Sequence, residues 1–164
     1  MTIKGPYVLS SKKTSGVTTY TVSDAVVSST VSGETKYYLN LKDAIAAVPN
    51  SEKADMVLLK DYAGADFVSY TKKDVTFDLN GHAYSRTNGG AAIQVSTNAT
   101  FTVKDTAENG SFSATNGIGI ETKAATATVN VLSGDITGTT YGISADNAAV
   151  NVRGGKVKGR VVVE

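Results

Sequence analysis

Short segments of alternating apolar and polar residues recur between residues 75 and 163. One set has apolar residues at its first and third positions, and its starts lie 26, 28 and 21 residues apart, at Val75, Phe101, Val129 and Val150. Another set begins at Ile93, Ile120, Ile143 and Val161. Alternation with a period of two is typical of β-strands with one buried face.

Between these two sets lies a further segment that follows a glycine-containing turn. Its members are Gly81-His82-Ala83, Gly110-Ser111-Phe112, Gly134-Asp135-Ile136 and Gly155-Lys156-Val157. Each period is therefore predicted to hold three short strands, with Phe77, Val103, Val131 and Val152 stacked at one level of the core.

Repeats of roughly 20 to 30 residues, built from strands too short to bury their apolar faces alone, are typical of solenoids. Three strands per period predict an all-β, right-handed, single-stranded parallel β-helix. Leucine-rich repeats have a similar period, but seven leucines in the chain are too few for them. A β-sandwich also contains short strands and frequent turns, and the repeated order of strands and turns argues against it.

An earlier rung is expected upstream of residue 75. Val57 and Leu59 lie 18 residues before the apolar pair Val75 and Phe77, and the chain is expected to return through Phe67 and Val68. The β-helix is thus predicted over residues 55–164, with about five rungs.

A short helix is expected over residues 39–50. Leu41, Ala44, Ile45 and Val48 have the i, i+3, i+4, i+7 spacing of one helical face. Asn40 can cap its start and Pro49 can help to end it. Laid across the N-terminal end of the β-helix, this helix would cover apolar cross-section and strand edges.

Residues 1–38 contain alternating pieces separated by Ser, Thr, Gly and Lys. This pattern favours β-hairpins. They are expected to form either a small sheet beside the helix or an arm that reaches a neighbouring chain.

Composition narrows the classes of function. Sixteen basic and fifteen acidic side chains leave a formal net charge of +1, so the basic surface of a nucleic-acid-binding protein is not expected. The chain has no cysteine and one histidine, and we expect neither a metal site nor a cofactor. No segment has the pattern of a signal peptide or a membrane span, so membrane insertion is not expected.

The segments SGETKYYLNLKDAIAAV, MVLLKD and DVTFDLNGH resemble the pectate-lyase-like β-helix modules of large surface proteins from Gram-positive gut bacteria. The close likeness covers about fifty residues, from Val31 to Asn80. It implies the β-helix architecture and a place on a cell surface, or on a virion of a phage that infects such bacteria. A likeness of fold does not by itself carry an activity across.

Catalysis on a polysaccharide needs acidic groups gathered on one face, as calcium ligands or as a facing carboxyl pair. The nearest candidates, Asp74 and Asp78, are expected to point outward from their strand, with Lys104 beside Asp78 and Arg153 farther along. Because the neighbouring row is neutral, a solvated salt-bridge ladder is the preferred interpretation. We therefore expect no catalytic residues and no enzymatic activity.

The single histidine, His82, follows the Asn80-Gly81 turn and is expected to face solvent, with Ala83 inside. Glycan-binding surfaces offer exposed aromatic faces. The candidates for glycan stacking near the β-helix are Tyr62, Tyr70 and Tyr84.

Val161, Val162 and Val163 would form the last strand of the final rung and present an apolar edge. Such edges are normally covered, so these residues are predicted to form an interface with neighbouring subunits or domains. We expect a non-catalytic structural or adhesion module, either a repeat of a bacterial adhesin or a decoration or fibre protein of a phage. The alternative is a β-helix protein that binds or degrades polysaccharide. The expected location is a cell or virion surface, although the chain carries no signal peptide.

Overall fold

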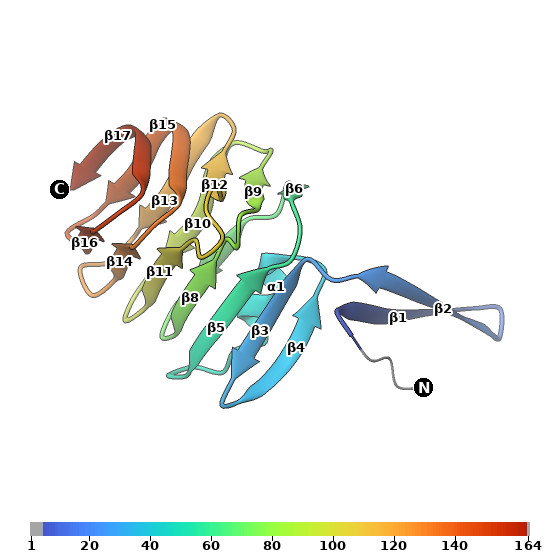
Figure 1. Cartoon of the computed structure of the whole chain (residues 1–164). Helices are drawn as coiled ribbons and strands as arrows, with labels where there is room; N and C mark the ends of the chain where they lie inside the picture. The colour runs from blue at the N-terminus through green and yellow to red at the C-terminus, as the bar shows by residue number, and fades with distance from the viewer. Residues whose placement is uncertain (1–4, 164) are drawn as a thin grey trace.

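The computed structural model describes residues 5–163. The fold is all-β with one short helix, and parallel strands stack into a β-solenoid of about four turns. The chain runs along the solenoid from the blue N-terminal strands to the red C-terminal strands (Figure 1).

A seven-stranded sheet forms one side of the solenoid, in the order β16-β14-β11-β8-β5-β3-β4. Its first five strands in this order are mutually parallel. They are β16 (Ala149–Val152), β14 (Thr128–Val131), β11 (Thr100–Lys104), β8 (Asp74–Asp78) and β5 (Lys53–Leu58).

A second sheet wraps around the rest of the core. The long strand β15 (Asp135–Ala145) links its two parts, because β15 pairs with β12 through its first residues and with β13 through its later ones. Outermost, β17 (Lys156–Val163) pairs with β15. The remaining strands are β6 (Tyr62–Gly64), β9 (Ala83–Arg86), β12 (Ser111–Ala114), β7 (Val68–Tyr70), β10 (Gly90–Val95) and β13 (Gly117–Thr122).

The predicted stacking of apolar residues is confirmed for two of the three sets. Val75, Phe101, Val129 and Val150 pair across neighbouring strands. Ile93, Ile120, Ile143 and Val161 do the same on the other sheet. In these sets a slip by one residue would turn every apolar side chain outward, so the alternation excludes such a slip.

Phe77, Val103, Val131 and Val152 lie at one level, as predicted. The first three are fully buried, whereas the side chain of Val152 is 49% exposed. The difference arises because Val152 belongs to β16, the last strand of its sheet.

Two register predictions are wrong. Tyr84, not Ala83, pairs with Phe112 and points into the core, while Ala83 is exposed. In the first rung, Met56 rather than Leu59 lies beside Phe77. Strand β5 buries Ala54, Met56 and Leu58, and Val57 on its opposite face is only half-buried.

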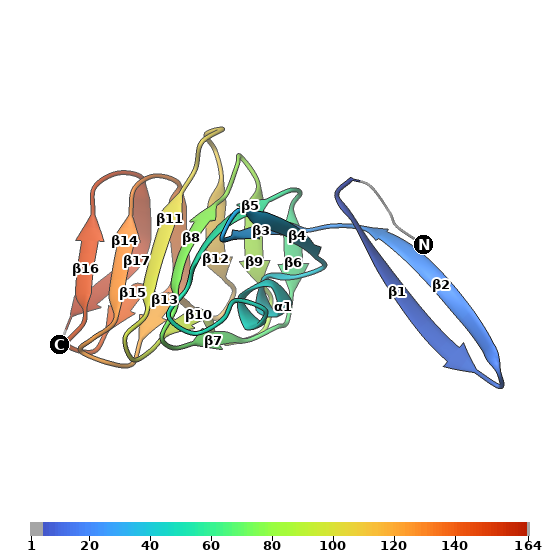
Figure 2. The ribbon, with the colours of Figure 1, turned by 90° about the horizontal axis from the view of Figure 1, so that it is seen from below.

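Helix α1 (Leu41–Ala46) is shorter than the predicted range of 39–50. The Asn40 side chain caps it, because Asn40 Oδ1 accepts a hydrogen bond of 2.7 Å from the Asp43 amide. Its buried face consists of Leu41, Ala44 and Ile45. The helix packs against β3, β4 and β7 at the N-terminal end of the solenoid (Figure 2).

The N-terminal residues form two hairpins. Strands β3 (Val27–Val31) and β4 (Glu34–Tyr38) are antiparallel, and β3 extends the seven-stranded sheet by pairing antiparallel with β5. Strands β1 (Tyr7–Thr14) and β2 (Val17–Asp24) form a separate two-stranded sheet that projects beyond this end (Figure 2).

Candidate functional site

Two aspartates, Asp78 at the end of β8 and Asp105 just after β11, hold the stacked turns of the solenoid together. Asp78 Oδ1 accepts hydrogen bonds from the amides of Asn80, at 2.9 Å, and Thr106, at 3.0 Å. Asp78 Oδ2 accepts another from the Thr106 hydroxyl at 2.8 Å. A turn on one rung is thereby tied to the turn on the next, 28 residues later in the chain.

The carboxylate of Asp105 does the same with glycine amides. It accepts hydrogen bonds from Gly81 at 2.7 Å and from Gly110 at 2.6 Å. The Ser133 hydroxyl in turn accepts from the Asp105 amide at 2.7 Å. The sequence analysis did not identify Asp105 as a functional residue. The one indication in the sequence is that Asp105 follows closely after the alternating segment Phe101–Val103.

Asp78 was predicted to point outward into solvent. This prediction is wrong, because Asp78 is only 5% exposed. The predicted neighbour Lys104 is present, with Nζ 3.4 Å from Asp78 Oδ2. Burial alone would raise the pKa of Asp78. The hydrogen bonds from Thr106 and Asn80 outweigh burial, the positive charge of Lys104 adds to them, and the pKa lies below its ordinary value.

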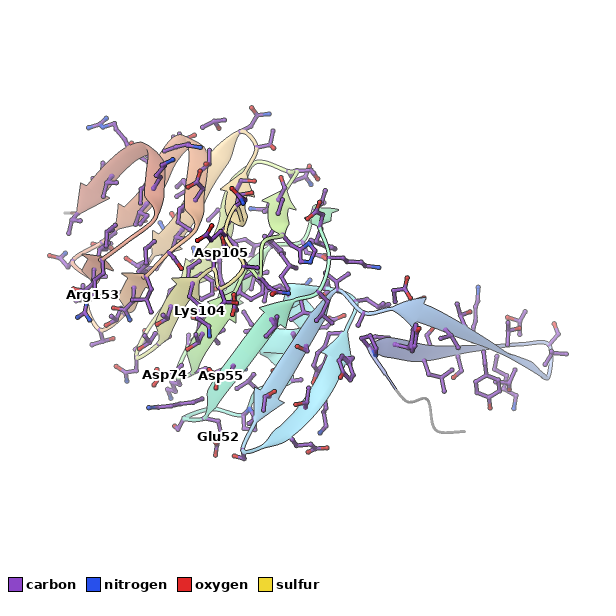
Figure 3. All side chains as sticks on the ribbon, in the orientation of Figure 1. Glu52, Asp55, Asp74, Lys104, Asp105 and Arg153 are labelled. Atoms are coloured by element: carbon purple, nitrogen blue, oxygen red, sulfur yellow. The ribbon has the colours of Figure 1, made fainter. Side chains whose placement is uncertain are left out.

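Asp74 shares a hollow with a second acid, Asp55, that the sequence analysis did not consider. Asp55 and Asp74 lie on the adjacent strands β5 and β8 (Figure 3). Both line a shallow hollow of about 230 Å³ with Lys53 and three threonines. Lys53 is the direct partner of Asp74 on β5, and Asp55 pairs with Thr76, so the two acids share the hollow without stacking on each other. Among residues 5–163, no group of three or more His, Asp or Glu side chains is arranged to hold a metal ion.

His82 is held at a turn. Its Nδ1 lies 3.2 Å from Asp61 Oδ1, and the same oxygen accepts a hydrogen bond of 2.9 Å from the Ala83 amide. The Ala83 amide first, and then His82, keep the pKa of Asp61 below its ordinary value. The side chain of His82 is partly rather than fully exposed, and its partner is a turn carboxylate.

The three tyrosines predicted to stack on glycans are not exposed aromatic faces. Tyr84 is 1% exposed, and Tyr70 is buried with its hydroxyl donating to Thr100 O at 2.8 Å. Tyr62 is half-buried and stacks on Tyr84 with ring centroids 5.3 Å apart. Burial, helped by the hydrogen bond to Asp66, raises the pKa of Tyr62 to about 12. These rings pack within the solenoid, which corrects their expected exposure.

A hollow of about 510 Å³ lies between α1 and β7. Its exposed aromatic side chain is Phe67, which is 43% exposed. The guanidinium of Arg86 lies 5.3 Å from the centre of the Phe67 ring and fixes one face of it. Lys42 and Ser69 also line the hollow.

The Lys73 ammonium closes one side of this hollow. Its Nζ donates a hydrogen bond of 2.9 Å to the carbonyl of Ile45 near the end of α1. Burial lowers the pKa of Lys73. The hollow therefore offers a partly open aromatic face beside cationic and hydroxyl groups.

The predicted interface residues lie at the far end of the solenoid. Val161 and Val163 are about half exposed, and Val162 is half-buried. Four basic side chains and no acidic one occur among residues 149–163, and they are Arg153, Lys156, Lys158 and Arg160. Figure 3 shows Arg153 at this end, away from Glu52, Asp55 and Asp74.

Comparison of the chain with protein-family models, with curated proteins and with solved structures found no match. Within residues 5–163, no helix is long and apolar enough to cross a membrane.

Proposed function

We propose that the chain is a non-catalytic structural or adhesion module displayed on a cell or virion surface. It would serve either as a repeat of a bacterial adhesin or as a decoration or fibre protein of a phage. We further propose that the solenoid is a right-handed parallel β-helix with three strands per rung, similar to pectate-lyase-like modules.

The hydrogen bonds made by the buried carboxylates of Asp78 and Asp105 support this proposal most directly. Asp78 and Asp105 accept hydrogen bonds from backbone amides of neighbouring turns. An acid or base catalyst must instead present its carboxyl group to a substrate. These two acids therefore act as turn-stabilising groups, and rigid stacking of turns is what a spacer or display module needs.

The experiment is a depolymerisation assay on pectin, on other uronate polymers and on bacterial cell-wall glycans. Production of new reducing ends or unsaturated products is measured for the full chain and for Asp55→Asn/Asp74→Asn, which removes both acids of the hollow between β5 and β8. We expect no product from either protein. Product formation that the double variant abolishes would overturn the non-catalytic assignment.

Polysaccharide binding is the second candidate, and the hollow beside α1 favours it. Sugar rings pack their C–H faces on aromatic rings, and Phe67 offers an exposed face next to Lys42, Ser69 and Lys73. Binding of labelled acidic oligosaccharides is compared between the unchanged chain and Phe67→Ala. Phe67→Leu, which keeps the apolar contact without the ring, is the matched control. If Phe67→Ala binds the oligosaccharides as tightly as the unchanged chain does, the hollow is not the binding site.

A further inference from the structure

The two ends of the seven-stranded sheet are complementary in direction. Its outermost strands are β16 at the C-terminal end and β4 at the N-terminal end. Strand β3 is antiparallel both to β5 and to β4. The two reversals cancel, so β4 runs in the same direction as β5 and β16. If a second copy followed along the solenoid axis, its β4 would meet β16 as a parallel neighbour.

The outer edge of β16 has backbone groups available for such pairing. The amides of Ala149 and Arg153 donate to Ala127 O and Val131 O, toward β14. Because successive amides of a strand alternate in direction, the amides of Val150 and Val152 point to the opposite, outer edge. An edge of this kind is a ready template for another strand.

A row of polar side chains crosses the whole sheet and reaches both edges. Its members are direct neighbours on successive strands, namely Thr35, Thr30, Asp55, Thr76, Thr102, Asn130 and Asn151. Hydrogen bonds join Asn151 to Asn130 at 3.0 Å and Asn130 to Thr102 at 3.1 Å. Thr30 and Thr35 are joined at 2.8 Å. A second copy in the same register would place its Thr35 beside Asn151.

The charges of the two ends are also complementary. Residues 149–163 carry four basic side chains and no acidic one, although Lys158 is already paired with Asp135 at 2.8 Å. Residues 24–66, which run from the end of β2 through β6, carry seven acidic and four basic ones. Exposed apolar groups lie at both ends, at Val152, Val161 and Val163 on one and at Tyr37 and Leu39 on the other. Opposite charge around an apolar patch favours one docking orientation over others.

The projecting hairpin stands at this same end of the solenoid, and its strand β1 contacts β4. It leaves the solenoid at the corner after β5, where Leu59 donates to Val26 O and Lys60 donates to Asp24 O. The hairpin extends beyond the N-terminal end (Figure 2). Alongside a second copy, its exposed side chains Tyr7, Tyr20 and Val22 would gain an apolar contact.

We propose that copies of this chain associate head to tail, with β16 of one copy pairing parallel with β4 of the next. This inference rests on the proposed structural function and names its partner as a second copy. The contact joins two different surfaces, so it does not close on itself as a two-fold contact does and can continue into a filament.

The test uses the absence of cysteine from the chain. Two single variants, Thr35→Cys and Asn151→Cys, are mixed under mild oxidation and examined for disulfide-linked dimers. Directly opposed residues on paired strands lie within disulfide range. We expect dimers in this mixture and none above background in either variant alone. Thr35→Cys mixed with Thr76→Cys, in the same polar row but on the inner strand β8, is the matched control.

A second pair of variants tests the backbone edge. Val152→Pro removes an outward amide without removing a hydrogen bond to β14, whereas Val152→Thr keeps the amide and the side-chain shape. Each change is added to Asn151→Cys, and circular dichroism checks folding. We expect loss of cross-linking with Val152→Pro and its retention with Val152→Thr.

Three outcomes would overturn head-to-tail pairing: no dimer in the mixture, dimers of Asn151→Cys alone, or cross-linking that a folded Val152→Pro variant retains. The first of these, with association still seen by sedimentation, would leave the proposed structural function standing. Glycan cleavage in the depolymerisation assay would overturn the proposed function whatever the cross-linking result.

Discussion

The ring of Tyr84 stacks on the ring of Phe112 inside the solenoid, with centroids 4.9 Å apart and planes 9° from parallel. Phe77 contacts both rings edge-on at 6.1 Å. These aromatic side chains come from strands on two sheets, and they connect the sheets across the core.

Replacing Tyr84 by alanine should therefore be costly. Loss of a buried aromatic ring leaves a cavity, and the free energy of unfolding should fall by about 3–5 kcal/mol. Tyr84→Phe keeps the stacked ring and should cost far less. Urea unfolding of both variants measures the difference, and equal losses would contradict a core position for the ring.

Val131 and Val152 occupy the same level on adjacent strands, but only Val131 is covered on both sides. Val131→Ala should lower the free energy of unfolding by about 1–4 kcal/mol because it opens a cavity. Val152→Ala should stay within about 0.5 kcal/mol at concentrations where the chain is monomeric. Equal effects under these conditions would mean that the solenoid end is covered within one copy.

Asp78 should make stability depend on pH. Its pKa is lower in the folded chain than its ordinary value of 3.8, so its contribution is present above that value and is lost as pH falls through the folded pKa. Asp78→Asn should lower the free energy of unfolding near neutral pH by about 1–3 kcal/mol. The gap between the two proteins should narrow below pH 3.8. A gap that is constant from pH 7 to pH 2 would exclude a titrating role.

The β1–β2 hairpin should open independently of the solenoid. Two-stranded hairpins are marginally stable in water, and this one has a two-residue turn with φ of 50° at Ser15 and 83° at Gly16. Gly16→Ala should strain that turn without changing the melting temperature of the solenoid. Hydrogen exchange should be faster in residues 7–24 than in β8 and β11. Equal protection of both parts would show that the hairpin is bound to another surface.

The later rungs were predictable because their alternation is regular and each inward residue follows its glycine by two positions. Before Tyr84 there is one more residue, since Gly81 is followed by both His82 and Ala83. That extra residue moved the expected inward position from Tyr84 to Ala83. A tyrosine that looked available to a ligand is thus a core residue.

The candidate site residues were harder to predict for a different reason. The carboxylate of Asp105 binds an amide 24 positions away in the chain, that of Gly81, and such contacts between rungs leave no local pattern. Phe67 precedes the three-residue strand β7, which is too short for alternation to indicate which way its neighbours point. Both features depend on the stacking of rungs, which the sequence indicates only approximately.

Sedimentation velocity of the unmodified chain over a range of protein and salt concentrations tests most directly the claim that the solenoid end is an interface. The weight-average sedimentation coefficient should rise with protein concentration and fall as added salt screens the basic and acidic ends. A single monomeric species at every protein and salt concentration would contradict the account.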